Sequence, residues 1–139
     1  MRVVALSDLH IAKEGYEESI ERIRETLSTI EADVLYFGGD LSESNHNDPV
    51  ESFHNFEEGL EVLASSPAKK KLFVAGNNDL ESLQLAPIGG HYTEIANRIR
   101  HYGFELLDNT PVIIDNIGFL GNIGWYDGSL WKKFKGKTQ

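Results

Sequence analysis

The chain has 139 residues, a formal net charge of −9 at pH 7 and no cysteine. This length fits one domain with one hydrophobic core, and the lack of thiols excludes disulfides and thiolate metal sites. The acidic charge argues against bulk attraction to nucleic acid or anionic membranes, but it does not exclude a phosphorylated substrate, because a bound divalent cation would reverse the local field.

No apolar stretch approaches the ~20 residues that span a bilayer, so no membrane partner is expected. The N-terminus enters a predicted strand at once, without the charged, apolar and cleavage regions of a signal peptide. Together with the absence of cysteine, this pattern favours a cytoplasmic protein.

The first predicted elements alternate between strand and helix. The continuous apolar run at residues 3–6 predicts a strand buried on both faces. Residues 17–30 predict an amphipathic helix, followed by a second strand at residues 34–37. The apolar stripe of that helix consists of Ile20, Ile23, Leu27 and Ile30.

A second helix is expected to begin at Pro49, with Asp48 as its N-cap. Its apolar face consists of Phe53, Phe56, Leu60 and Leu63. Pro67 ends the helix and leads to a third strand at residues 72–75.

The pattern is weaker in the C-terminal part of the chain. Residues 92–101 predict a helix with Gly103 as a left-handed cap, and residues 104–107 a fourth strand. Residues 111–115 and 118–123 predict two strands joined by a tight turn at Asn116. No repeat or linker divides the chain, and the short loops predict one α/β domain with parallel strands.

Three predicted strands end at residues that can bind a metal ion. The first leads into Asp8, Leu9 and His10, the second into Gly38, Gly39 and Asp40, and the third into Gly76, Asn77, Asn78 and Asp79. Ligands of parallel sheets bind beyond the carboxyl ends of the strands. Carboxylates crowded there repel each other, and a divalent metal ion removes that repulsion.

The spacing of these residues suggests how ions would be held. Asp8 and His10 are two residues apart, so in an extended chain both point to the same side and can hold one ion. The Asp40 carboxylate has two oxygens and can bridge two ions. Glycines at 38 and 39 allow the backbone to approach closely. Asn77 offers a neutral amide oxygen to a second ion. Two cations ~3.5–4 Å apart can hold a phosphate and activate a water. Oxygen and imidazole ligands favour manganese, iron or zinc.

These motifs, in this order and at these spacings, resemble the first three motifs of the calcineurin-like metallophosphoesterases. The later run from Gly121 to Asp127 also resembles a segment of that family. The resemblance implies a β-sandwich flanked by helices with a dimetal site above it. It also implies hydrolysis of a phosphomonoester or phosphodiester by a metal-bound hydroxide.

The resemblance also implies a role for each residue. Asp8 and His10 would bind the first metal. Asp40 would bridge the two ions, and Asn77 would bind the second.

The third motif departs from the family pattern, in which a histidine stands where this chain has Asn78. That histidine contacts the phosphate and assists the leaving group together with the acid that follows it, here Asp79. An amide donates hydrogen bonds but supplies no proton at neutral pH. We therefore place Asn78 and Asp79 in the catalytic positions and expect slow turnover or a preference for good leaving groups.

A second departure concerns the C-terminal half. The family supplies further metal-binding histidines there, ending in a Gly-His-x-His motif, and this chain stops at Gln139 before any such motif. We therefore expect a single domain over residues 1–139 that is incomplete at its C-terminus, with the fold truncated in its second half.

Other interpretations remain open from the sequence. Asp8 and Asp40 could cap the helices that follow them, and Asn77 and Asn78 could be turn residues. The chain could be a weak or inactive family member that serves as a metal-binding or interaction module. A homo-oligomer could complete exposed sheet edges. A response-regulator-like phosphoacceptor domain also groups acids at strand ends, but the motif at residues 8–10 fits it badly.

Overall fold

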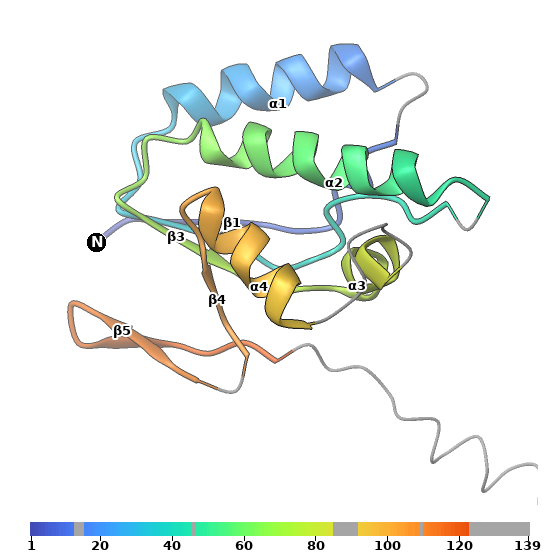
Figure 1. Cartoon of the computed structure of the whole chain (residues 1–139). Helices are drawn as coiled ribbons and strands as arrows, with labels where there is room; N and C mark the ends of the chain where they lie inside the picture. Colours follow the sequence, from blue (N-terminus) through green and yellow to red (C-terminus); the bar gives the residue numbers. More distant parts are fainter. Residues whose placement is uncertain (13–15, 46, 85–91, 109, 123–139) are drawn as a thin grey trace, which may run out of the picture.

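The computed structural model describes residues 1–12, 16–45, 47–84, 92–108 and 110–122. Its centre is a four-stranded parallel sheet with the order β1-β2-β3-β4 (Figure 1). The strands are β1 (Val3–Leu6), β2 (Val34–Phe37), β3 (Lys70–Phe73) and β4 (Glu105–Leu106). The parallel pairing predicted from the alternation of strands and helices is confirmed.

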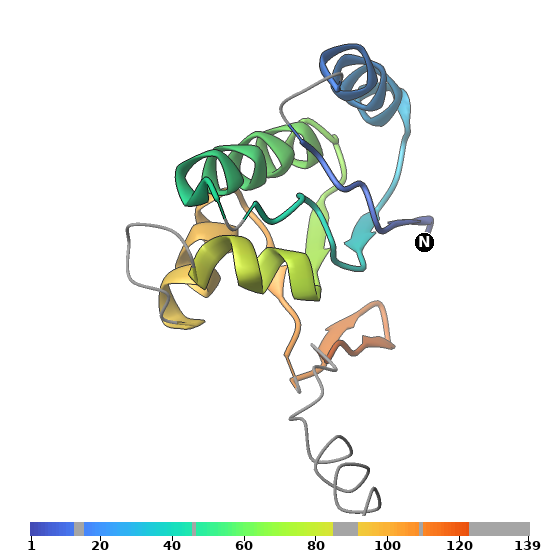
Figure 2. The same ribbon diagram turned by 90° about the vertical axis from the view of Figure 1, so that its right-hand side faces the viewer.

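The helices are α1 (Glu17–Thr29), α2 (Pro49–Ala64), α3 (Asn77–Gln84) and α4 (Tyr92–His101). Helices α1, α2 and α4 cover one face of the sheet (Figures 1 and 2). The ring of Phe73 lies at the centre of this layer, with the rings of Phe37, Phe56 and Phe104 at centroid distances of 5.1, 6.2 and 6.0 Å. None of the described helices is long and apolar enough to cross a membrane.

Two predicted helix ends are confirmed in detail. The side chain of Asp48 accepts a hydrogen bond of 2.9 Å from the Glu51 backbone N–H, and Pro49 is the first residue of α2. Helix α4 ends at His101, and the left-handed residue that caps it is Gly103, whose φ is +85°. There the backbone N–H of Phe104 donates to the Ile99 carbonyl, which is the bond that defines a Schellman cap.

The opposite face of the sheet is covered by a hairpin of β5 (Val112–Ile114) and β6 (Ile117–Phe119). Asp115 and Asn116 form its turn, and both have positive φ, as a tight hairpin turn requires. The residues of this second core are Val34, Leu72, Val74 and Leu107 from the sheet side and Val112, Ile114 and Phe119 from the hairpin. They alternate along the strands with the residues of the first core, so the sheet is a middle layer.

The prediction that the first strand is buried on both faces is wrong. Val3 is 42% exposed, whereas Val4 and Leu6 pack into the core beneath the helices. The reason is position, because β1 is an edge strand and none of its residues belongs to the described core beneath the hairpin. The third strand also differs, since it begins at Lys70, where pairing with Val34 starts, rather than at residue 72.

Candidate metal centre

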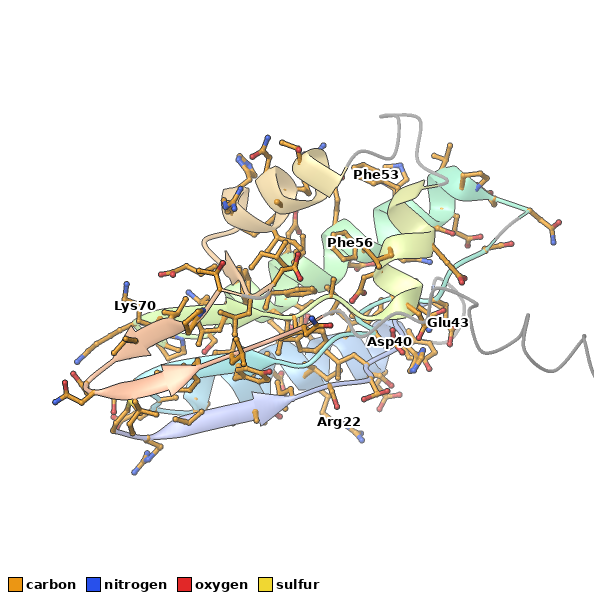
Figure 3. All side chains as sticks on the ribbon, turned by 90° about the horizontal axis from the view of Figure 1, so that it is seen from below. Arg22, Asp40, Glu43, Phe53, Phe56 and Lys70 are labelled. Atoms are coloured by element: carbon orange, nitrogen blue, oxygen red, sulfur yellow. The ribbon has the colours of Figure 1, made fainter. Side chains whose placement is uncertain are left out.

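The register of the sheet brings the three motifs to one edge. Leu6, Phe37 and Phe73 are aligned as the last paired residues of β1, β2 and β3. The loops that follow them carry the acidic and amide residues singled out in the sequence. The carboxyl ends of the strands therefore meet where the ligands were predicted to lie, and Figure 3 shows Asp40 and Glu43 at this end of the sheet.

The first two loops remain hydrogen-bonded to each other beyond the strands. The backbone N–H groups of Asp8 and His10 donate to the carbonyls of Gly39 and Asp40, at 2.9 and 3.1 Å. Pairing then resumes in an isolated parallel bridge between Ile11 and Ser42. The two loops are thus fixed at both ends, and the side chains on them have little freedom to separate.

Asp8, His10 and Asp40 form a compact cluster. Each offers one ligand atom, and these atoms all lie within 4.8 Å of one another. The Nε2 atom of His10 lies 3.8 Å from Oδ1 of Asp8, which is exposed to solvent. Two carboxylates and an imidazole in this arrangement suit a divalent transition-metal ion, so the donor set fits the predicted cofactor.

The backbone of the cluster is unusual. Five described residues other than glycine have a positive φ, and three of them are Asp8, His10 and Asp40, at 56°, 47° and 55°. The other two form the hairpin turn, where that conformation is normal. Left-handed backbone at a non-glycine residue costs of order 1–3 kcal/mol and is found mainly where function requires it. The strain therefore coincides with the candidate centre.

Two glycines let the second and third loops touch. A Cβ atom on Gly39, whose φ is +99°, would lie 2.6 Å from the Gly76 nitrogen. A Cβ atom on Gly76 would lie 2.6 Å from the Asp40 nitrogen and would collide with the Asp40 carboxylate. Only glycine fits at either position, so the close approach predicted for Gly39 is confirmed.

Asp79 ties these two loops together. Its side chain is fully buried and accepts backbone N–H bonds from Asp40 at 3.0 Å, Leu41 at 2.8 Å and Gly76 at 2.9 Å. Burial raises the pKa of Asp79 to about 6, although the three N–H donors act in the opposite direction. The structure gives this carboxylate a structural role, and the catalytic role suggested by the resemblance stays a prediction.

Asp40 also caps a helix, but not the one that follows it. The Asn78 backbone N–H at the start of α3 donates to Oδ1 of Asp40 at 3.1 Å, and α2 is capped by Asp48 instead. The N-cap residue of α1 is Tyr16, without a side-chain cap bond. The interpretation of Asp8 and Asp40 as caps of the helices that follow them is therefore wrong.

The two asparagines lie at the start of α3, beside the cluster. Asn77 is exposed, and the backbone of both its neighbours contacts Asp40. Its role as a ligand of a second ion stays a prediction. The side-chain oxygen of Asn78 accepts a hydrogen bond of 3.3 Å from the Ser44 hydroxyl, which also lies 3.0 Å from Glu81. Sequence reasoning missed Ser44, because only the fold brings it to α3.

Glu43 was missed as well. Its Oε1 atom lies 2.9 Å from Nδ1 of His10. The sequence shows only its place three residues after Asp40, and the pairing of its loop with the loop of His10 appears only in the structure. Residues 123–127 of the run that resembles a later family segment lie outside the described residues.

The fold and the cluster define an α/β protein with a candidate divalent-metal centre at the carboxyl edge of a parallel sheet. A model of the calcineurin-like phosphoesterase family matches residues 1–136, and the chain belongs to this family. The resemblance inferred from the three motifs is thereby confirmed.

The chain is also similar to the crystal structure of a phosphopantetheinyl hydrolase from Mycobacterium tuberculosis, with a TM-score of 0.55 and 20% identity. The match covers 82% of this chain and 38% of that chain, so the likeness supports the predicted fold over less than half of the larger protein. A search of curated proteins gave no match.

Proposed function

We propose that this chain carries the metal-binding part of a phosphoesterase that hydrolyses a phosphomonoester or a phosphodiester. The observation that carries the proposal is the convergence of Asp8, His10 and Asp40 within 4.8 Å in a member of the calcineurin-like phosphoesterase family. Asp8, His10 and Asp40 would hold one ion of manganese, iron or zinc, and Asp40 with Asn77 would contribute to a second.

Bound there, divalent ions would neutralise phosphate charge and lower the pKa of a coordinated water. The residues of the chain would hold the metal ligands in position. Asp79 and the paired loops hold Asp40 in place through its backbone, and Asn78 holds that carboxylate through its N–H. The substrate would be a phosphorylated molecule, which the acidic chain can accept only at a site of reversed charge.

Asn78 is proposed to steady the phosphate. Its side-chain oxygen accepts a hydrogen bond from the Ser44 hydroxyl, so the NH₂ group of the same amide would be the part that donates to the phosphate. An amide gives no proton to a leaving group, so hydrolysis would be fastest for substrates whose leaving group departs as an anion. A nitrophenyl diester is such a substrate.

A manganese-supplemented assay with a chromogenic nitrophenyl phosphodiester tests this proposal. We expect Asp40→Asn to lower the metal-dependent rate by roughly 100-fold or more, because it removes a ligand charge. Asp115→Asn is the matched control, because it makes the same change of charge at another aspartate with a positive φ. Asp115 lies in the turn of the β5–β6 hairpin, on the side of the molecule where the N-terminus lies (Figure 1). Equal rates for the two variants would overturn the proposal.

The unchanged chain and Asp40→Asn also distinguish an active phosphoesterase from the alternative, a weak or inactive metal-binding module. That alternative is motivated by Asn78, which stands where the family pattern has a histidine. Metal binding in calorimetry that is lost in Asp40→Asn, together with no metal-dependent hydrolysis by the unchanged chain, would favour the module.

Location and assembly belong to the same proposal. The absence of cysteine supports a cytoplasmic location, where disulfides rarely form. The exposed face of β1, with Val3 at its edge, supports a second copy of the chain as a partner. Sedimentation of the chain as a monomer at high concentration would contradict such a dimer.

A further inference from the structure

We propose that Glu43 is a positioning residue of the metal centre. Its carboxylate holds the proton of His10 on Nδ1 and thereby keeps the lone pair of Nε2 directed at the cluster. The proposal rests on the proposed function in one respect, namely that the partner of Nε2 is a metal ion.

The surroundings of the His10 ring support this assignment. Nδ1 is buried, and Oε1 of Glu43 lies 2.9 Å from it, at an angle that does not make a hydrogen bond in this structure. Nδ1 has no other hydrogen-bond partner among the described residues. The Glu43 side chain is half exposed, so a small rotation can align its carboxylate with the ring. A buried ring nitrogen next to one carboxylate is best satisfied by that alignment.

The backbone holds the two residues at this distance. The Glu43 N–H donates to the Ile11 carbonyl at 3.0 Å, and the His10 N–H donates to the Asp40 carbonyl at 3.1 Å. Both residues therefore belong to the paired loops beyond β1 and β2. Glu43 lies at the same end of the sheet as Asp40 (Figure 3).

The chemistry of imidazole decides which nitrogen faces the metal. A neutral ring has one N–H donor and one acceptor nitrogen, and an ionised carboxylate only accepts. With the proton on Nδ1 toward Glu43, Nε2 is the acceptor, and Nε2 lies 3.8 Å from Oδ1 of Asp8 within the cluster. With the proton on Nε2, a lone pair would face the carboxylate and the nitrogen that faces the cluster could not bind a cation. Carboxylates that orient a ligating histidine in this way typically change metal affinity by ~10–100-fold.

The tautomer of His10 is the direct test, and it needs neither metal nor substrate. The full chain, free of metal and labelled with ¹⁵N, is studied at pH 8.5 by long-range ¹H–¹⁵N correlation, and the His10 signals are assigned by their loss in His10→Asn. We expect the Nδ1–H form in the unchanged protein. In Glu43→Ala we expect the Nε2–H form, which a neutral imidazole prefers in water.

Controls separate this effect from charge and from folding. Glu58→Ala removes the same charge from an exposed residue of α2 and should leave the His10 tautomer unchanged. Glu43→Gln keeps an oxygen that accepts from Nδ1–H and should retain the tautomer. If Glu43→Ala does not fold, Glu43→Ser, whose short side chain cannot reach Nδ1, replaces it with the same expected switch to the Nε2–H form. Calorimetry with Mn²⁺ or Zn²⁺ should then show ~10–100-fold weaker binding for Glu43→Ala, with no change for Glu58→Ala.

Two results would overturn the proposal: the Nε2–H form in the unchanged protein, or the same tautomer in the unchanged protein and in Glu43→Ala. A tautomer that switches as expected in a chain without hydrolytic activity would instead count against the proposed function alone.

Discussion

At the scale of single residues, Asp40 links the candidate metal centre to the rest of the protein. Its backbone N–H is held by Asp79, its Oδ1 atom by the start of α3, and its side chain belongs to the cluster with Asp8 and His10. Asn78 is the neighbouring residue that departs from the family pattern. Its backbone supports Asp40, so its side chain can be changed without loss of that contact.

We predict that Asn78→His increases turnover for phosphate esters with poor leaving groups. A histidine supplies a proton that the amide cannot, and general acid assistance is typically worth up to ~10²–10⁴-fold. The measurement is kcat for an alkyl and for a nitrophenyl ester at neutral pH. Asn78→Gln, which keeps an amide, should show no gain, and an equal gain on both esters would contradict the explanation.

The cluster residues could be predicted from sequence because each follows a recognisable apolar strand. Asp8, His10 and Asp40 needed only the rule that parallel strands end at one edge. Glu43 and Ser44 could not be found in this way. Their contacts with His10 and Asn78 depend on how two loops pair beyond the strands, which no local pattern records.

At the scale of elements, α3 is held at its start by other parts of the chain. Gly76 precedes it and has no side chain to cap it. The Asn78 N–H donates to Asp40, and Asp79, in the first turn of α3, accepts from the N–H of Gly76. The sequence did not predict this helix, because Gly76, Asn77 and Asn78 are typical of turns. Its cap comes from Asp40, far away in the chain, so local propensity was a poor guide.

We predict that Asp79→Ala lowers the free energy of unfolding by ~3–5 kcal/mol. The substitution leaves three backbone N–H groups without their acceptor, two of them from the loop after β2. Urea unfolding followed by circular dichroism measures the change. Asp48→Ala removes an aspartate that accepts one exposed N–H and should cost only ~1 kcal/mol. Similar losses in both variants would show that Asp79 does not join the loops.

At the scale of the whole molecule, the two faces of the sheet are covered by different kinds of structure. Helices cover one face, and the β5–β6 hairpin covers the other over β2, β3 and Leu107, which follows β4 (Figure 2). The sequence predicted both the hairpin and its turn at Asn116. It could not show that the first strand lies at the edge, because strand order depends on contacts between distant segments.

We predict that Gly121→Ala destabilises the protein by ~1–3 kcal/mol, because the chain after the hairpin packs tightly on the sheet. A Cβ atom there would lie 2.5 Å from Val74 and 2.7 Å from Leu107. Gly118→Ala is the control, since a Cβ atom on Gly118 meets nothing within 4 Å, and its effect should stay within ~0.5 kcal/mol. Equal thermal midpoints for the two variants would contradict this packing.

The bridge between Ile11 and Ser42 has a consequence for the arrival of a cation. Backbone pairing on both sides of the turns that carry Asp8, His10 and Asp40 means that their geometry is set when the chain folds, so the proposed metal centre would be preorganised. Entry of an ion would then require the loss of its own hydration shell rather than a rearrangement of the polypeptide. Substitutions that loosen this pairing should weaken ion affinity even though they leave every coordinating atom in place.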